Sequence, residues 1–291
     1  MDRLQLDKNA KLTGRVYFKD EVMWLGLSGS GASFTFDGTK LVLKLKGDNI
    51  AVGDNPIDYA RIAVYVDGKR VVDEMIDCAE KEVMVIGRTE SAKSVVEIIK
   101  LSESPMSAIG IEAFTEGSAE ALPEKPLKIE FIGDSITCGY GVDDEDENHQ
   151  FTTATEDVTK AYAYKTAKAL DAEYSMFSAS GYGIVSGYTE GDEPISEQTI
   201  PQFYCSYGFS RGNFTGTAPQ DIPWDFSKYV PQIIVINLGT NDDSYCRDHK
   251  DRQAVFSKLY ADFLAVVREK NPQAYILCTV GIMGERIFPA V

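Results

Sequence analysis

The 291-residue sequence predicts a multidomain β plus α/β protein, in which an N-terminal β-sandwich precedes an α/β/α domain with a parallel sheet. Three observations predict it. Residues 14–121 read as many short strands, a proline-bearing segment at 123–126 interrupts the pattern, and from residue 127 apolar runs alternate with helical periodicity. A chain of this length is also long enough for two cores of ordinary size.

The N-terminal region is patterned as strands. Residues 33–36 alternate between polar and apolar side chains, and in residues 41–45 leucine recurs at every second position, as in a half-buried strand. The dipeptides Asp37-Gly38 and Asp67-Gly68 predict turns, and the second lies between two apolar runs, as in a tight hairpin with positive φ. Since no segment has helical periodicity, we expect residues 1–122 to form the sandwich.

Residues 123–126 carry two prolines and two charges and predict an extended linker. Residues 127–291 then predict the second domain, with strands and helices in the order 127–132, 160–172, 233–238, 252–270 and 274–280. This order is typical of a parallel sheet with helices on both faces. In the last helix, a stripe with helical spacing is expected to face the sheet, namely Val255, Leu259, Phe263 and Val266.

Charge and composition exclude some partners. A net charge of -16 disfavours nucleic acid and anionic membranes, because both attract a basic surface. No apolar stretch approaches the roughly 20 residues that span a bilayer. The start of the chain lacks a secretion signal, so a cytoplasmic protein is expected, or a secreted one if a leader was removed. Five cysteines without CxxC spacing indicate reduced thiols, and the oligomeric state stays open.

Three candidate site residues each follow a predicted strand. Ser135 comes in Gly133-Asp134-Ser135 after the first strand of the second domain, where ligands bind in open α/β sheets. Gly181 follows the apolar run 174–178, and Asn241 follows the strand 233–238. A serine hydroxyl, a glycine N–H and an asparagine amide suit acyl transfer through an oxyanion. Taken singly, the serine is equally suited to capping a helix, and the other two to forming turns.

These segments resemble the GDSL/SGNH hydrolases, whose blocks match residues 133–135, 180–181 and 239–242. A closer resemblance is to carbohydrate esterase family 2, through the segments 133–141, 151–156, 224–226, 237–242 and 281–284. This resemblance implies an N-terminal jelly roll joined to an SGNH domain. It implies Ser135 as nucleophile, with the N–H groups of Ser135 and Gly181 and the amide of Asn241 as oxyanion donors. It also implies removal of acetyl groups from mannan- or xylan-type plant carbohydrate, without metal or organic cofactor.

The chain departs from the family at its general base. The family places a histidine in an Asp-x-x-His or Trp-His-Pro block near the C-terminus, and no such block occurs in the 291 residues. We therefore expect the general-base histidine to be absent from this chain and the sequence to be truncated before it. His149, after the acidic run 143–147, and His249 are expected in solvated loops, and Asp134 is expected to shape the turn before Ser135.

The resulting hypothesis is a carbohydrate acetyl esterase whose partner is an acetylated oligosaccharide or polysaccharide. The alternative is a truncated or degenerate esterase that acts as a carbohydrate-binding module, with Tyr140, Tyr182 and Trp224 as candidates for stacking on sugar rings. A lipase or thioesterase of the same superfamily is disfavoured, because no long apolar loop suggests a groove for an acyl chain.

Overall fold

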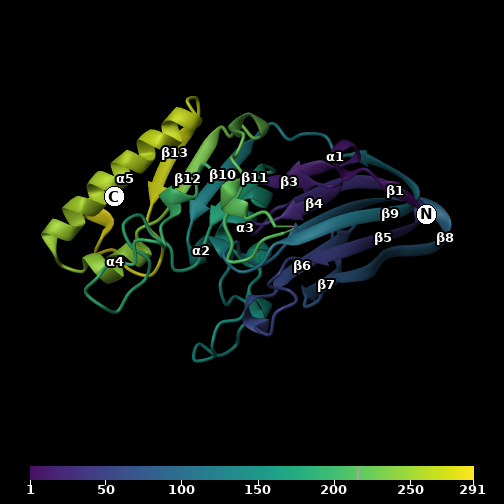
Figure 1. Cartoon of the computed structure of the whole chain (residues 1–291). Helices are drawn as coiled ribbons and strands as arrows, with labels where there is room; N and C mark the ends of the chain where they lie inside the picture. The colour runs from purple at the N-terminus through teal and green to yellow at the C-terminus, as the bar shows by residue number, and fades with distance from the viewer. Residues whose placement is uncertain (215) are drawn as a thin grey trace.

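The computed structural model describes residues 1–214 and 216–291. It contains an antiparallel β domain followed by a domain built on a parallel sheet, which confirms the predicted fold class (Figure 1). The elements of the first domain are β1 (Asp2–Leu4), α1 (Leu6–Asn9), β2 (Lys11–Thr13), β3 (Val16–Lys19), β4 (Val22–Leu25), β5 (Gly31–Gly47), β6 (Ala60–Val66), β7 (Lys69–Ile76), β8 (Glu80–Lys100) and β9 (Ile109–Ala121). Those of the second are β10 (Lys128–Gly133), α2 (Ser135–Cys138), α3 (Tyr162–Ala169), β11 (Glu173–Ser178), β12 (Ile233–Asn237), α4 (Thr240–Cys246), α5 (Lys250–Lys270) and β13 (Tyr275–Thr279).

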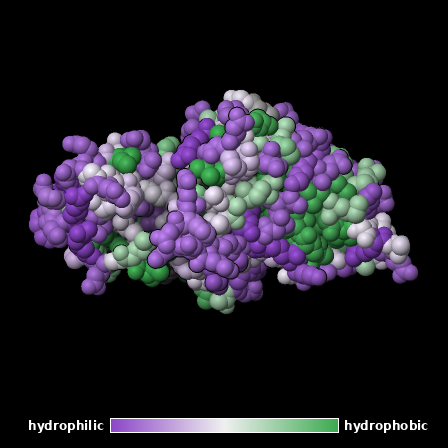
Figure 2. Space-filling view, turned by 90° about the horizontal axis from the view of Figure 1, so that it is seen from below, coloured by the Kyte–Doolittle hydropathy of each residue, from purple (hydrophilic) through white to green (hydrophobic). Residues whose placement is uncertain are grey.

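The β domain is organised around β5, which pairs with both β8 and β9 in the order β3-β4-β9-β5-β8-β6-β7. Leu41, Leu43 and Leu45 of β5 are fully buried, while the intervening Lys44 reaches the surface, as the alternation predicts. Seen from below, the surface of this N-terminal half carries an apolar patch, whereas the rest of that face is mostly hydrophilic (Figure 2).

One of the two predicted turns is confirmed and the other is wrong. Asp67 and Gly68 both have positive φ and join β6 to β7, so they form the expected tight hairpin. Asp37 and Gly38 lie inside the 17-residue strand β5, at a register irregularity opposite Gly117 of β9. A side chain on Gly38 would clash with the β9 backbone, so this glycine permits a close strand contact rather than a reversal.

The second sheet is parallel throughout, in the order β11-β10-β12-β13. Alternate residues of β10 point to opposite faces. Ile132 packs in the core that contains α5, and Phe131 packs in the core that contains α3 and part of the β domain. β9 ends at Ala121 and β10 begins at Lys128, while the division at 123–126 stays a prediction.

The predicted stripe on α5 is wrong in three of its four residues. Val255, Leu259 and Val266 are exposed, and only Phe263 is buried. The buried side runs instead through Phe256, Tyr260, Phe263 and Val267. Both stripes have helical spacing, so periodicity did not distinguish them. The aromatic one fills the space over β12, because larger rings bury more apolar surface.

A buried polar network joins the two domains. Arg15, between β2 and β3, is fully buried and donates hydrogen bonds to the carbonyls of Tyr204 and Ser206. Its guanidinium also pairs with Glu130 of β10 at 3.3 Å and lies over the ring of Phe177. Buried hydrogen bonds and ion pairs are directional, and a buried group that loses its partner is strongly destabilising. These contacts of Arg15 therefore favour one defined packing of the first domain on the second. Among the described helices, none is long and apolar enough to cross a membrane.

Candidate active site

The carboxyl ends of three neighbouring strands bring the candidate residues to one edge of the parallel sheet. Gly133, the last residue of β10, pairs with Ser178 at the end of β11 and with Asn237 at the end of β12. Ser135 follows Gly133 by two residues, Gly181 follows Ser178 by three, and Asn241 follows Asn237 by four. Parallel register thus gathers all three residues at the edge where open α/β sheets bind ligands.

Ser135 is the first residue of the short helix α2. Asp134 caps this helix by accepting a hydrogen bond from the Ile136 N–H at 3.0 Å. A Cβ on Gly133 would lie 2.0 Å from the Thr137 hydroxyl, so only glycine permits this sharp exit from β10. Ser135 is partly exposed, and neither its hydroxyl nor its N–H has a hydrogen-bond partner among residues 1–214 and 216–291. Both groups are therefore open to a ligand.

Gly181 lies in a loop in which several neighbouring main-chain groups are hydrogen-bonded. The Ser180 N–H donates to Glu103, the Tyr182 N–H donates to Ala179 O, and Gly181 O accepts from Tyr188. The N–H of Gly181 has no partner in the described part of the chain. Its φ of +79° is a left-handed conformation that other residues rarely adopt. This local geometry leaves one fixed N–H donor unfilled, as an oxyanion site needs.

Asn241 lies in the first turn of α4 and is buried. Its Nδ2 donates to the Tyr182 carbonyl at 2.8 Å, which ties α4 to the loop that contains Gly181. An amide nitrogen has two N–H bonds, so one donor of Asn241 stays available. The segments that follow β11 and β12 are thereby joined to each other beside the end of β10.

Asp242 is a site residue that the sequence reasoning did not single out. Its carboxylate is fully buried and accepts hydrogen bonds from the N–H groups of Ile184, Val185 and Ser186. Burial raises its pKa to about 6 despite these donors. The sequence offered one indication of this role: Asp242 directly follows Asn241 and lies in the first turn of a helix, where a carboxylate is favoured.

The buried Asp134 makes the stability of the fold pH-dependent. Burial, followed by the nearby Asp242 and Glu103, raises the pKa of Asp134 to about 7, and its Oδ2 has no hydrogen-bond partner among the residues that the structure describes. A carboxyl whose pKa is raised by folding contributes stability below its unfolded pKa, near 3.8. That contribution is lost as the pH rises through about 7.

We therefore expect Asp134→Asn to gain stability relative to the parent as the pH rises from 4 to 8. The gain in the free energy of unfolding should be on the order of 2 to 4 kcal/mol, because the asparagine keeps the cap oxygen but does not ionise. Urea unfolding at both pH values measures it. Asp225→Asn is the matched control, since Asp225 makes the same cap to Ser227 at an exposed position. The prediction would be contradicted if the free energies of unfolding of Asp134→Asn and the parent differed by the same amount at both pH values.

Among the described residues, neither histidine makes a hydrogen bond to Ser135. His149 Nδ1 lies 2.9 Å from Asp144 Oδ1 in the exposed acidic loop, and His249 is the exposed residue before α5. Both positions agree with the expected solvated loops. In the part of the chain that the structure describes, the Ser135 hydroxyl thus has no base beside it.

The three candidate aromatic residues are not gathered at one place. Tyr140 is half-exposed and stacks on Phe151, and the two line a groove beside α2. Tyr182 packs against Phe203 and Phe209 next to Gly181. Trp224 lines a different groove, against the β domain, and both Arg15 and Lys228 lie over its ring. Tyr140 and Tyr182 therefore remain near the candidate site, and Trp224 does not.

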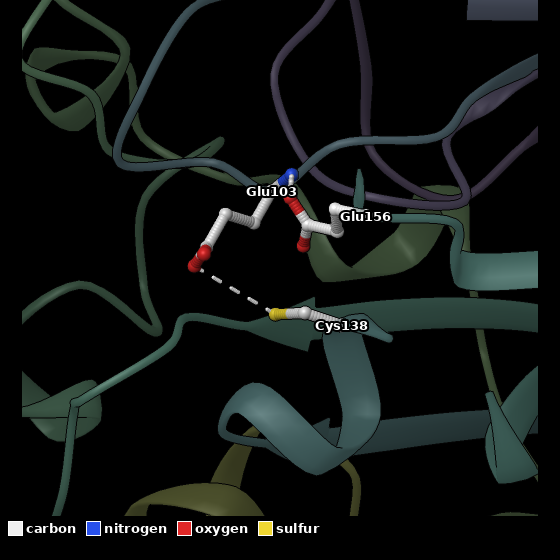
Figure 3. A group of neighbouring side chains, drawn as sticks. All are labelled: Glu103, Cys138 and Glu156. Carbon is white, nitrogen blue, oxygen red and sulfur yellow. Dashed lines mark hydrogen bonds between the residues drawn. The ribbon is translucent and has the colours of Figure 1, made fainter. Parts of the chain in front are cut away.

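One buried cluster has the donor atoms of a metal site. Glu103, Cys138 and Glu156 bring possible ligand atoms within 4.8 Å of one another (Figure 3). A positive charge is already present, because the fully buried Lys100 donates through Nζ to the carbonyls of Ser102 and Glu103. The Cys138 thiol has its pKa raised well above the ordinary value by burial, so the thiolate that binds metals is disfavoured. The raised thiol pKa and the nearby ammonium group of Lys100 both disfavour a metal ion among these residues.

Ser135 lies at the carboxyl edge of a parallel sheet, and its hydroxyl has no hydrogen-bond partner among the described residues, which is a position that serine-dependent acyl hydrolases use for the nucleophile. The GDSL-like lipase/acylhydrolase family model matches residues 131–290, more than half of the chain. The chain belongs to this family. The carbohydrate esterase 2 N-terminal model matches residues 12–126, which agrees with the resemblance stated from the sequence.

Characterised relatives cover nearly the whole chain. The cellulase/esterase CelE of Acetivibrio thermocellus is 34% identical over 88% of this chain, which spans 29% of that relative's length. The acetylxylan esterase / glucomannan deacetylase of Cellvibrio japonicus is 29% identical over 94% of this chain and 72% of its own length. A family two carbohydrate esterase from Clostridium thermocellum, solved in complex with cellohexaose, has a TM-score of 0.78 at 27% identity, over 96% of this chain and 80% of that one.

Proposed function

We propose that the chain is a carbohydrate acetyl esterase that removes O-acetyl groups from plant oligosaccharide or polysaccharide of the xylan or mannan type. The observation that carries this proposal is the set of unfilled donors around Ser135: its own N–H, the N–H of Gly181 and one N–H of Asn241. The name of the Cellvibrio japonicus relative, acetylxylan esterase / glucomannan deacetylase, supports the substrate class.

In the proposed reaction, the hydroxyl oxygen of Ser135 attacks the acetyl carbonyl carbon and an imidazole takes its proton. The carbonyl oxygen becomes an oxyanion, which accepts hydrogen bonds from Ser135, Gly181 and Asn241. Collapse of the tetrahedral intermediate breaks the ester bond, the sugar hydroxyl leaves with the proton, and an acetyl-serine remains. Water then releases acetate by the same steps.

The proposed reaction needs a general base, and both His149 and His249 lie in exposed loops away from Ser135. We propose that this base is a histidine in the Asp-x-x-His or Trp-His-Pro block that the family resemblance implies. The extended form is defined here as the 291 residues followed by the C-terminal segment of a family member that contains such a block. Without a base, catalysis retains about a thousandfold to ten-thousandfold advantage over water, through the oxyanion donors and binding.

The test compares acetate release by the extended form and by the 291-residue chain, on acetylated xylan and glucomannan oligosaccharides. The extended form should be faster by about a hundredfold or more, because its serine has a base. Calorimetric titration with the same oligosaccharides runs in parallel. Binding without acetate release by the extended form would favour the binding-module alternative. The lack of a base beside the Ser135 hydroxyl in the described part of the chain agrees with that alternative. Faster hydrolysis of p-nitrophenyl octanoate than of the acetate ester would favour a lipase instead.

A further inference from the structure

Glu103 is a fully buried residue of the N-terminal domain that reaches the edge of the parallel sheet. It lies in the connection between β8 and β9, remote in sequence from every family block. One carboxylate oxygen, Oε2, accepts a hydrogen bond from the Ser180 N–H at 2.5 Å and contacts the Cys138 thiol at 3.8 Å (Figure 3). Cys138 is in α2, which begins at Ser135, and Ser180 precedes Gly181. A single oxygen therefore joins the segments that carry the nucleophile and an oxyanion donor.

The position of Glu103 is itself fixed from both sides. Its N–H donates to Glu156 Oε2 at 2.9 Å, as Figure 3 shows, and its carbonyl accepts from Lys100 Nζ at 2.9 Å. Cys138 also donates to the Ser178 hydroxyl at the end of β11. All of these groups except Ser180 are fully buried or nearly so, and hydrogen bonds are strong and directional where water is excluded. Lys100 belongs to the β domain and Glu156 to the second domain, so hydrogen bonds from both domains hold the main chain of Glu103.

The bond to Ser180 restrains the peptide group directly before the one that carries the Gly181 N–H. Glu103 holds that preceding group through the Ser180 N–H, and the following group is held by the bonds of the Tyr182 N–H to Ala179 and of the Tyr188 N–H to Gly181 O. Glycine with positive φ is otherwise the least restrained residue of a loop. Without Glu103, one of the two anchors is lost.

We infer that Glu103 is a positioning residue of the catalytic site, through which the N-terminal domain aims the Gly181 N–H at the oxyanion. The inference rests on the proposed function for its catalytic consequence, and on geometry alone for the order of the loop. Through Glu103, the β domain would contribute a residue to the active site, in addition to any role in binding carbohydrate. Burial raises the pKa of Glu103, and an acceptor oxygen for Ser180 is present in either protonation state.

The first measurement needs no enzymatic activity. Hydrogen exchange of residues 179–183 is followed by mass spectrometry in the parent chain, Glu103→Ala, Glu103→Gln and Ser104→Ala. Glu103→Ala should accelerate exchange of this segment at least tenfold, and Glu103→Gln should leave it nearly unchanged, because its amide oxygen still accepts from Ser180. Ser104→Ala is the matched control, since Ser104 is equally buried and its hydroxyl bonds to Phe209 across the same domain interface.

The second measurement is the kinetics of the extended form. Glu103→Ala should lower kcat about tenfold to a hundredfold with KM changed less than threefold, because a misplaced donor weakens the transition state selectively. Glu103→Gln should restore most of kcat, and Ser104→Ala should retain it. Unchanged exchange in Glu103→Ala overturns the inference. Faster exchange with unchanged kcat overturns its catalytic part. If the extended form without substitutions releases no acetate, the proposed function fails, while the exchange data still decide whether Glu103 holds the loop.

Discussion

Replacing Ser135 with alanine is expected to reduce acetate release by the extended form by at least about a thousandfold. The loss follows because no acetyl-enzyme can form without the hydroxyl, and the remaining oxyanion donors only stabilise a slow attack by water. Acetate is measured after incubation with acetylated xylan oligosaccharides. The melting temperature should stay close to that of the parent, since the Ser135 hydroxyl bonds to no described residue.

Ser180→Ala is the matched control for this experiment. Ser180 also lies at the sheet edge, and its buried hydroxyl has no hydrogen-bond partner within residues 1–214 and 216–291. It should keep most of the activity, because its N–H to Glu103 does not depend on the side chain. A fluorophosphonate probe should label Ser135 alone. Labelling of Ser180, or unchanged turnover in Ser135→Ala, would remove Ser135 from its proposed role.

The second large effect is expected at Asn241. Asn241→Ala should lower kcat of the extended form by about a hundredfold to a thousandfold, because one oxyanion donor is lost in the transition state. Asn241→Asp should be at least as slow, since a carboxylate of the same size has no N–H to donate and repels the oxyanion. KM should change little in either variant, which separates loss of a transition-state contact from loss of binding.

A control on the same helix distinguishes the amide from the fold around it. Ser244→Ala removes a hydrogen bond to the Asn241 carbonyl at 2.6 Å and leaves the amide in place. Its kcat should stay within about threefold of the parent, because the donor is untouched. If kcat of Asn241→Ala fell by less than fivefold, the role of Asn241 would be limited to its hydrogen bond with Tyr182, which joins α4 to that loop.

Local sequence signals predicted the elements well where a pattern had one physical meaning. Asp67-Gly68 lies between two apolar runs and forms the expected hairpin, because two consecutive positive φ values suit little else. Asp37-Gly38 has the same composition but lies in β5, where Gly38 faces Gly117 of a strand far away in sequence. A dipeptide does not reveal what will lie across from it.

Helical periodicity on α5 was equally ambiguous. Two stripes of correct spacing run along this helix, and the structure buries the one with Phe256 and Tyr260 and exposes the one with Val255 and Leu259. Spacing predicts that a helix is amphipathic. Which side faces inward depends on the shape of the opposing sheet, which no window of the sequence contains.

The sequence by itself determined the order of strands and the residue that follows each of them. Since parallel strands end at the same edge, this order sufficed to predict that Ser135, Gly181 and Asn241 would come together. Only the tertiary structure decided what holds them there. Glu103 meets Ser180 from 77 residues away, and Asp242 meets Val185 from 57. Both carboxylates are buried acceptors for main-chain N–H groups, which every residue but proline offers, so no motif marks the partner and only packing selects it.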